Sequence, residues 1–189
     1  MTPKQIERIG NRIKQIKVAL AADKKHWGGF YHDGRGLRYL PPQLYISIDD
    51  FAGALRYFNW FHKNFPSDSC YSTFLYEWTI VLFKTGRLKE AEKKALEVFC
   101  SDNGVLFKIL QIGDANMAND ELANKYLNEL KNKGSLADFN TWILHLIRQD
   151  FFLDFCNKYI ELEKRIETEP DKAAKQLLQN QLELLSSKM

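Results

Sequence analysis

The sequence predicts an all-α protein, and three observations carry this prediction. Apolar residues recur at steps of three and four along most of the chain, which places them on one face of a helix. Clusters of glycine, proline and aspartate interrupt these rows at the points where helical hairpins would turn. No stretch of useful length alternates apolar and polar residues, as a half-buried strand would.

The composition is that of a globular, water-exposed chain. Its 189 residues, 45% of them hydrophobic, suit one compact domain over 1–189, and the net charge of +3 neither requires nor excludes a nucleic-acid partner. Cys70, Cys100 and Cys156 are widely spaced and form no CxxC pair, so they indicate reduced thiols rather than disulfides or a zinc site. Neither a signal peptide nor an apolar run of about 18 residues is present, so we expect a cytoplasmic protein with no membrane partner.

The first predicted helix covers residues 3–22. Thr2 can cap it, and Pro3 suits its first position because the amide that proline lacks has no helical partner there. An apolar row repeats along one face, and it consists of Ile6, Ile9, Ile13, Ile16 and Leu20. A basic row, made of Lys4, Arg8 and Arg12, follows another face. We expect the apolar row to pack on the body of the protein, with a second copy of the chain as the alternative, so that homo-oligomers could form through the terminal helices.

Residues 26–38 form the least helical part of the chain, because four glycines permit backbone angles that other residues avoid. We expect Trp27, Phe30 and Tyr31 to anchor this loop by burial. The spacing of the glycines does not match a phosphate-binding loop. His26, His32 and Asp33 could be metal ligands, but His-x5-His is not a helical-face spacing and no second ligand pair follows, so His26 and His32 are expected to be surface histidines.

Two helical hairpins follow this loop. Asp50 caps the second helix of the first hairpin, and Gly86 ends the first helix of the second hairpin in a left-handed conformation. Leu88, Ala91 and Ala95 are expected to point inward from the last helix. The four predicted helices are 41–48, 51–64, 71–84 and 87–98.

The rest of the chain predicts a weaker third pair of helices and three C-terminal helices. The third pair covers 105–112 and 119–131. The C-terminal helices are expected at 136–148, 151–166 and 170–186, the last with a row of leucines on one side.

Residues 35–135 resemble the tetratricopeptide repeat (TPR) family. Tyr45, Ala54, Phe58 and Pro66 stand at the spacing of the signature positions of a repeat of about 34 residues. Ala91 occupies the small-residue position of the second repeat, although that repeat has Ala95 where phenylalanine is usual. The segment HDGRGLRYLPPQLY also resembles bacterial TPR-like proteins. The resemblance implies a TPR-like α-solenoid of antiparallel helix pairs over 35–135, preceded by a helix and loop at 1–34 and followed by helices at 136–189.

TPR proteins bind peptides or protein surfaces in a groove lined by the first helices of successive pairs. The resemblance therefore implies a scaffold that binds a protein or peptide partner. The implied partner-binding residues are Tyr39, Gln43, Tyr76, Ile80, Phe83 and Lys108. The lysine and asparagine pattern that clamps a chaperone C-terminus is absent at these positions. The alternative is that the aromatic row packs against the N-terminal helix and is not a groove.

The two other classes of function are a nucleic-acid-binding protein and an enzyme. A nucleic-acid-binding protein could use the basic row of the first helix together with Arg35, Arg38 and Arg56. An enzyme is not expected, because no serine, histidine or acid lies in a recognisable catalytic motif. We therefore expect neither catalytic residues nor a metal or cofactor.

Overall fold

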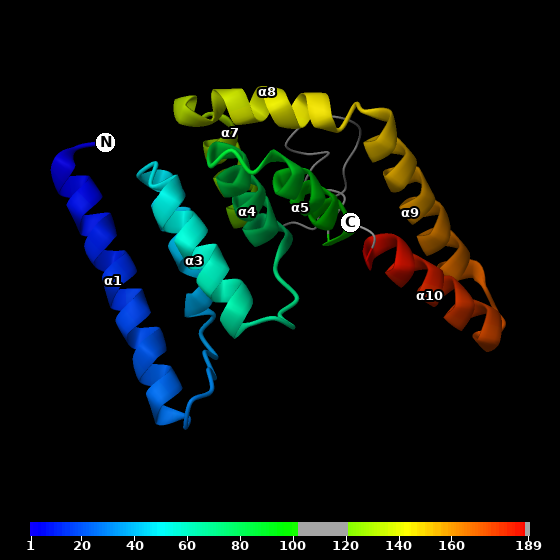
Figure 1. Ribbon diagram of the computed structural model, residues 1–189, viewed down its shortest axis with the longest axis horizontal. Coiled ribbons are helices and arrows are strands. Elements are labelled where there is room, and N and C mark those ends of the chain that lie inside the picture. Colours follow the sequence, from blue (N-terminus) through cyan, green and yellow to red (C-terminus); the bar gives the residue numbers. More distant parts are fainter. Residues whose placement is uncertain (102–120, 188–189) are drawn as a thin grey trace. The chain divides into compact units, whose positions relative to one another are not determined.

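A computed structural model of the protein describes residues 1–101 and 121–187 (Figure 1). All regular structure in these ranges is helical, which confirms the predicted all-α class. The chain separates into two compact units, Met1–Ala91 and Glu92–Met189. The boundary falls within a helix and inside the region 35–135 that the sequence predicts as one run of repeats, while the single domain over 1–189 stays a prediction.

The first helix, α1 (Pro3–His26), is one turn longer than predicted. The Thr2 hydroxyl accepts a hydrogen bond from the Gln5 backbone amide, and the Gln5 side chain accepts one from the Thr2 amide, which forms a capping box. Ile13, Ile16 and Leu20 are buried, and α1 packs against α2 (Leu40–Ser47) of the same unit. The prediction that the first helix packs on the body of the protein is therefore confirmed within the first unit.

The loop after α1 corrects one prediction. Trp27 and Phe30 were predicted to anchor the loop by burial. Phe30 is 78% exposed and Trp27 is 49% exposed, so this prediction is wrong for both residues. The loop is held by polar contacts instead, because Asp23 on α1 accepts hydrogen bonds from the backbone amides of His32 and Asp33. Tyr31 is the aromatic residue of this loop that packs inward, against the rings of Trp60 and Phe65.

The core of the first unit is formed by α2, α3 (Phe51–Asn64) and α4 (Ser72–Lys84), with the 3-10 turn η1 (Leu37–Tyr39) before α2. Each of these three helices packs against the other two. The Asp50 side chain accepts the Gly53 amide at the start of α3, as predicted. Aromatic rings fill the space between α3 and α4, and Phe58 and Trp78 stack with their centroids 4.6 Å apart.

Gly86 ends α4 with a positive φ of 77°, in the predicted left-handed conformation. The Arg87 amide donates to the Leu82 carbonyl across this turn. The next helix, α5 (Leu88–Ser101), buries Ala91 and Ala95 completely, as predicted. Leu88, which was expected to point inward, is 46% exposed because the helix begins at this residue and its first turn lies at the surface.

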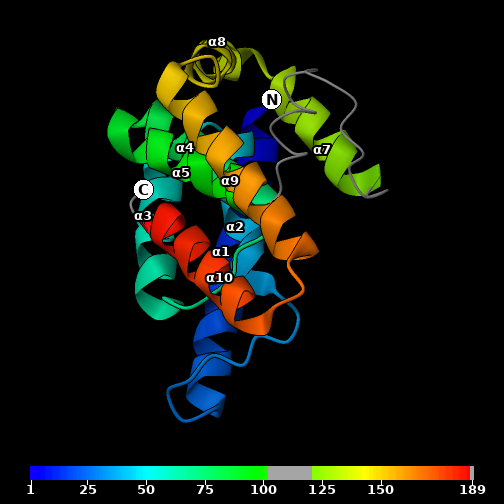
Figure 2. The same ribbon diagram turned by 90° about the vertical axis from the view of Figure 1, so that its right-hand side faces the viewer.

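The second unit contains α7 (Glu121–Lys131), η2 (Gly134–Leu136), α8 (Ala137–Leu146), α9 (Asp150–Thr168) and α10 (Lys172–Ser187). Figure 2 shows α10 folding back along α9, and these two helices pack closely. The Tyr159 hydroxyl donates to the carbonyl of Cys100, which joins α9 to the end of α5 within this unit. The predicted helix 105–112, with Lys108, lies outside the described residues.

Candidate functional site: a basic groove beside the first helix

The predicted aromatic groove is not open at its central positions. Tyr76 is 1% exposed and Ile80 is 0% exposed, so both side chains belong to the core of the first unit. They are buried because α4 packs against both α2 and α3 and keeps little surface of its own. Burial raises the pKa of the Tyr76 hydroxyl, as expected for a phenol that has lost its contact with water.

The other predicted groove residues do not form a common exposed surface. Gln43 is exposed and Phe83 is half-buried, whereas Lys108 lies outside the described residues. Tyr39 is half-buried, and its ring packs edge-on against the ring of Phe74, with the centroids 5.2 Å apart. Its hydroxyl donates a short hydrogen bond to Asp68, so the polar end of this side chain is already used within the chain.

Arg38 belongs to the same polar cluster and is a structural residue. Its Nε donates to Asp68 Oδ2 at 2.8 Å, and its Nη1 donates to Asp33 Oδ2 at 3.1 Å. Burial alone would lower the pKa of the guanidinium, but the hydrogen bonds to Asp68 and Asp33 outweigh it and raise the pKa. Of the three arginines predicted to contact nucleic acid, Arg38 is therefore committed to ion pairs within the chain.

Of the two acids in this cluster, neither of which the sequence identified, Asp33 is the one that also caps a turn. It is buried, and its two carboxylate oxygens accept the backbone amides of Leu37 and Arg38 at the start of η1. Asp33 therefore caps η1 and pairs with Arg38. The sequence offered no helix start at this point, because the first predicted helix after the loop begins at residue 41 and η1 was not predicted.

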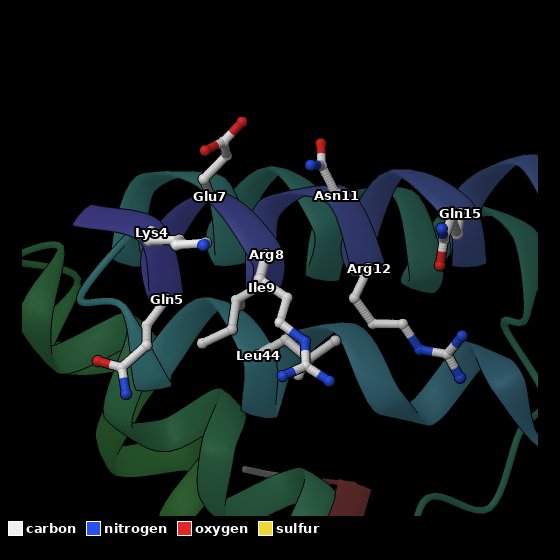
Figure 3. A pocket seen from close by; sticks show the side chains of 9 residues that line it. All are labelled: Lys4, Gln5, Glu7, Arg8, Ile9, Asn11, Arg12, Gln15 and Leu44. Carbon is white, nitrogen blue, oxygen red and sulfur yellow. The ribbon is translucent and has the colours of Figure 1, made fainter. Parts of the chain in front are cut away.

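An open groove of about 890 Å³ runs along α1 on the side that faces α2 (Figure 3). We name it the basic groove, because its cations are Lys4, Arg8 and Arg12 of the predicted basic row. Leu44 of α2 and Ile9 of α1 supply its apolar contacts. The complete lining is Lys4, Gln5, Glu7, Arg8, Ile9, Asn11, Arg12, Gln15 and Leu44.

The difference in length between the two helices keeps this groove open. The 24 residues of α1 span about 36 Å, whereas the 8 residues of α2 span about 12 Å. Since α2 can cover only part of α1, burial along α1 fades toward its start, where Ile9 is half-buried and Ile6 is exposed. The side chains of the basic row therefore have solvent in front of them.

The charge of the basic groove is not neutralised from within. Among the residues that the structure describes, no carboxylate forms an ion pair with Lys4, Arg8 or Arg12. Figure 3 shows the one acid of the lining, Glu7, pointing to the opposite side of α1 from Arg8 and Arg12. Three cations spaced four residues apart thus present a row of positive charge at intervals of about 6 Å.

The sequence identified the cations of this groove but not its apolar side. Leu44 was predicted only as part of a short helix, and no sequence pattern shows which flank of α1 that helix covers. In the part of the chain that is described, no group of three or more histidine, cysteine or acidic side chains could hold a metal ion. None of the described helices is long and apolar enough to cross a membrane.

Comparison of the chain with protein-family models, with curated proteins and with solved structures found no match.

Proposed function

We propose that the protein is a non-catalytic interaction module that binds an acidic segment of a protein partner in the basic groove. The observation that supports this most directly is the row of Lys4, Arg8 and Arg12, exposed and without carboxylate partners in the described residues. Such a row attracts a complementary row of acids and accelerates encounter with it.

The spacing of the groove favours a helical partner. Acidic residues at every fourth position of a partner helix lie about 6 Å apart along its axis, which is the spacing of the three cations on α1. Ile9 and Leu44 then provide an apolar surface for the side chains beside that acidic row. An amphipathic helix with one acidic edge would meet both requirements.

We also propose that the helix pairs are stacked as in TPR proteins. In a stack of helix pairs, the first helix of each pair contacts its own partner and the first helix of the next pair. The packing of α2 against both α3 and α4 supports this arrangement for the first unit. The surface that we propose for binding differs from the one that the TPR resemblance implies, because Tyr76 and Ile80 are buried.

Nucleic acid is the second candidate, because phosphates are also attracted by a basic row. Two observations favour an acidic protein. Among the described residues, no aromatic side chain lines the basic groove, so bases would have no ring on which to stack there. Arg38 is held in ion pairs with Asp33 and Asp68, which removes one of the three arginines that this function would use.

The test measures binding of a fluorescent helical peptide with glutamate at every fourth position, by anisotropy at low and moderate salt. The matched probes are the same peptide with glutamine and a single-stranded oligonucleotide. We expect the glutamate peptide to bind, and the triple variant Lys4→Gln/Arg8→Gln/Arg12→Gln to lose at least about tenfold in affinity.

The control variant Lys14→Gln/Lys25→Gln/Arg35→Gln removes the same charge from exposed positions outside the groove. It should bind the glutamate peptide as the unchanged protein does, apart from a small effect of net charge. Equal losses in both triple variants would show that net charge alone attracts the peptide. Tighter binding of the oligonucleotide than of the glutamate peptide would reject the protein-binding proposal in favour of nucleic acid.

A further inference from the structure

A second cavity lies on the other flank of α1, away from the basic groove. At about 100° per residue, the positions of Lys17 and Ala21 fall on the opposite side of the buried row of α1 from Arg8 and Arg12. The cavity has a volume of about 320 Å³ and lies between α1, the loop after it, and α3. We name it the aromatic pocket, and its lining is Lys17, Leu20, Ala21, Tyr31, Arg56, Tyr57 and Trp60.

The walls of the aromatic pocket are rings held in place by other contacts. The ring centroids of Tyr57 and Trp60 are 5.1 Å apart, and Tyr31 meets Trp60 edge-on at 5.7 Å. The Tyr57 hydroxyl donates to the Arg38 carbonyl at 2.8 Å, which fixes that side chain from behind. The ring of Tyr31 is further held by Phe65. A pocket with fixed aromatic walls loses little conformational freedom when a flat group enters it.

The charged side chains that line the aromatic pocket are cations, although the carboxylates of Asp23 and Asp33 lie near enough to act on Tyr31 and Tyr57. Lys17 and Arg56 are exposed at its edge, and neither forms an ion pair with a carboxylate within the described residues, although the Lys17 ammonium lies 5.9 Å from the centroid of the Tyr57 ring. No acid is among the lining residues. Burial raises the pKa of Tyr31 and of Tyr57, so both hydroxyls stay protonated at neutral pH and add no negative charge. The pocket therefore suits a ligand with an apolar body and an anionic end.

We propose that the aromatic pocket binds a single aromatic group that carries a carboxylate, as a free aromatic acid or as the C-terminal residue of a polypeptide. Stacking against Trp60, which is half-buried whereas Tyr57 is only 2% exposed, accounts for the ring, and the guanidinium of Arg56 can donate two parallel hydrogen bonds to a carboxylate. The volume is near the lower end for ligand pockets, which fits one ring rather than a nucleotide. The lining residues of α1 and α3 lie in mid-helix, so the pocket has no helix N-terminus to supply the amide donors that phosphates commonly use.

The test titrates the full-length protein with N-acetyl-L-phenylalanine and follows the indole N–H signal of Trp60 by NMR. The chain has four tryptophans, so the Trp60→Phe variant identifies this signal among four. The matched probes are N-acetyl-L-phenylalanine amide, which lacks the charge, and phenyl phosphate. We expect saturable shifts with the acid and at least roughly tenfold weaker binding of the amide, since a charge-assisted hydrogen bond is lost.

Two single variants locate the carboxylate. Arg56→Gln and Lys17→Gln should each weaken binding of the acid. In both variants the acid should still shift the indole N–H signal of Trp60. Arg35→Gln removes an exposed cation outside the pocket and should leave the affinity unchanged. Equal binding of the acid and the amide, or tighter binding of phenyl phosphate, would overturn the proposal.

A further pair of probes distinguishes the two sources of the carboxylate. A hexapeptide that ends in phenylalanine should bind at least as tightly as N-acetyl-L-phenylalanine if the ligand is a polypeptide C-terminus, and its C-terminal amide should not bind. Binding of the free acid alone would assign the pocket to a small aromatic acid. These results are independent of the basic groove, because none of its lining residues belongs to the aromatic pocket.

Discussion

The aromatic row of α4 and the basic row of α1 differ in how far they are exposed to solvent. Tyr76 and Ile80 of α4 were expected to line a binding surface, and they are buried in the core. The apolar row of α1 was expected to cover the repeats, and it does pack inward, but the same helix leaves Arg8 and Arg12 open to solvent. Burial therefore depends on how many neighbours a helix has. The helix α4 packs against two other helices, whereas α1 lies beside a much shorter one.

The largest expected effect is a loss of stability at the buried residue Tyr76 of α4. Tyr76→Ala should lower the free energy of unfolding by about 3–5 kcal/mol, because it removes a large buried ring and leaves a cavity. Chemical denaturation measures this loss. Gln43→Ala, at an exposed predicted groove position, is the matched control and should leave the midpoint unchanged. If the Tyr76→Ala protein is as stable as the control, Tyr76 is a surface residue and the original groove prediction returns.

A smaller loss of stability is expected at Ala91. Its side chain is completely buried, so Ala91→Leu should cost about 1–3 kcal/mol by overpacking. Lys89→Leu places the same side chain at an exposed position of the same helix and should have little effect on the denaturation midpoint. An unchanged midpoint for Ala91→Leu would mean that the helix has room at this position, and the TPR-like spacing of Ala54 and Ala91 would lose its packing explanation.

The half-buried phenol of Tyr39 predicts a loss of stability at alkaline pH. Burial first, and then the hydrogen bond to Asp68, raises the pKa of Tyr39 from 10.0 to about 12. Because the folded value is higher than the unfolded one, the contribution to stability is complete below pH 10 and disappears as the pH rises to 12. Thermal melts from pH 9 to 12 should show this decline, and it should be shallower in Tyr39→Phe than in Tyr71→Phe, which changes an exposed ring.

The smallest effect on stability is expected on the exposed side. Arg8→Gln and Arg12→Gln should leave the denaturation midpoint unchanged, because neither side chain has an ion-pair partner to lose within the described residues. Arg38→Gln is the comparison, and it should lower the midpoint because it leaves Asp33 buried without its cation. Equal effects at Arg8 and Arg38 would show that the basic row has a structural role that its contacts do not reveal.

The local parts of this fold could be predicted from the sequence. The cap of α1 by Thr2, the cap of α3 by Asp50 and the end of α4 at Gly86 each depend on a few adjacent residues, and the structure has them where predicted. The basic row could also be predicted, because Lys4, Arg8 and Arg12 lie on one helix.

The predictions that failed depend on neighbours distant in the sequence. Tyr76 and Phe30 are both large aromatic residues, and only the surrounding helices decide that the first is buried and the second exposed. The aromatic pocket collects residues from α1, the following loop and α3, so no single stretch of sequence contains its pattern. Asp68 could not be placed beside Arg38 from the sequence, because the two residues are 30 positions apart and meet only in the folded chain.

A map of the binding surface by NMR tests most directly whether the basic groove binds an acidic peptide. The ¹⁵N-labelled protein is titrated with the glutamate peptide, and the amide shifts are assigned along the chain. We predict that the largest shifts fall between residues 4 and 15 of α1 and at Leu44 of α2, and that they vanish in the Lys4→Gln/Arg8→Gln/Arg12→Gln variant. Shifts centred on Tyr39, Gln43 and Phe83, with the basic groove unperturbed, would contradict the account and restore the surface that the TPR resemblance implies.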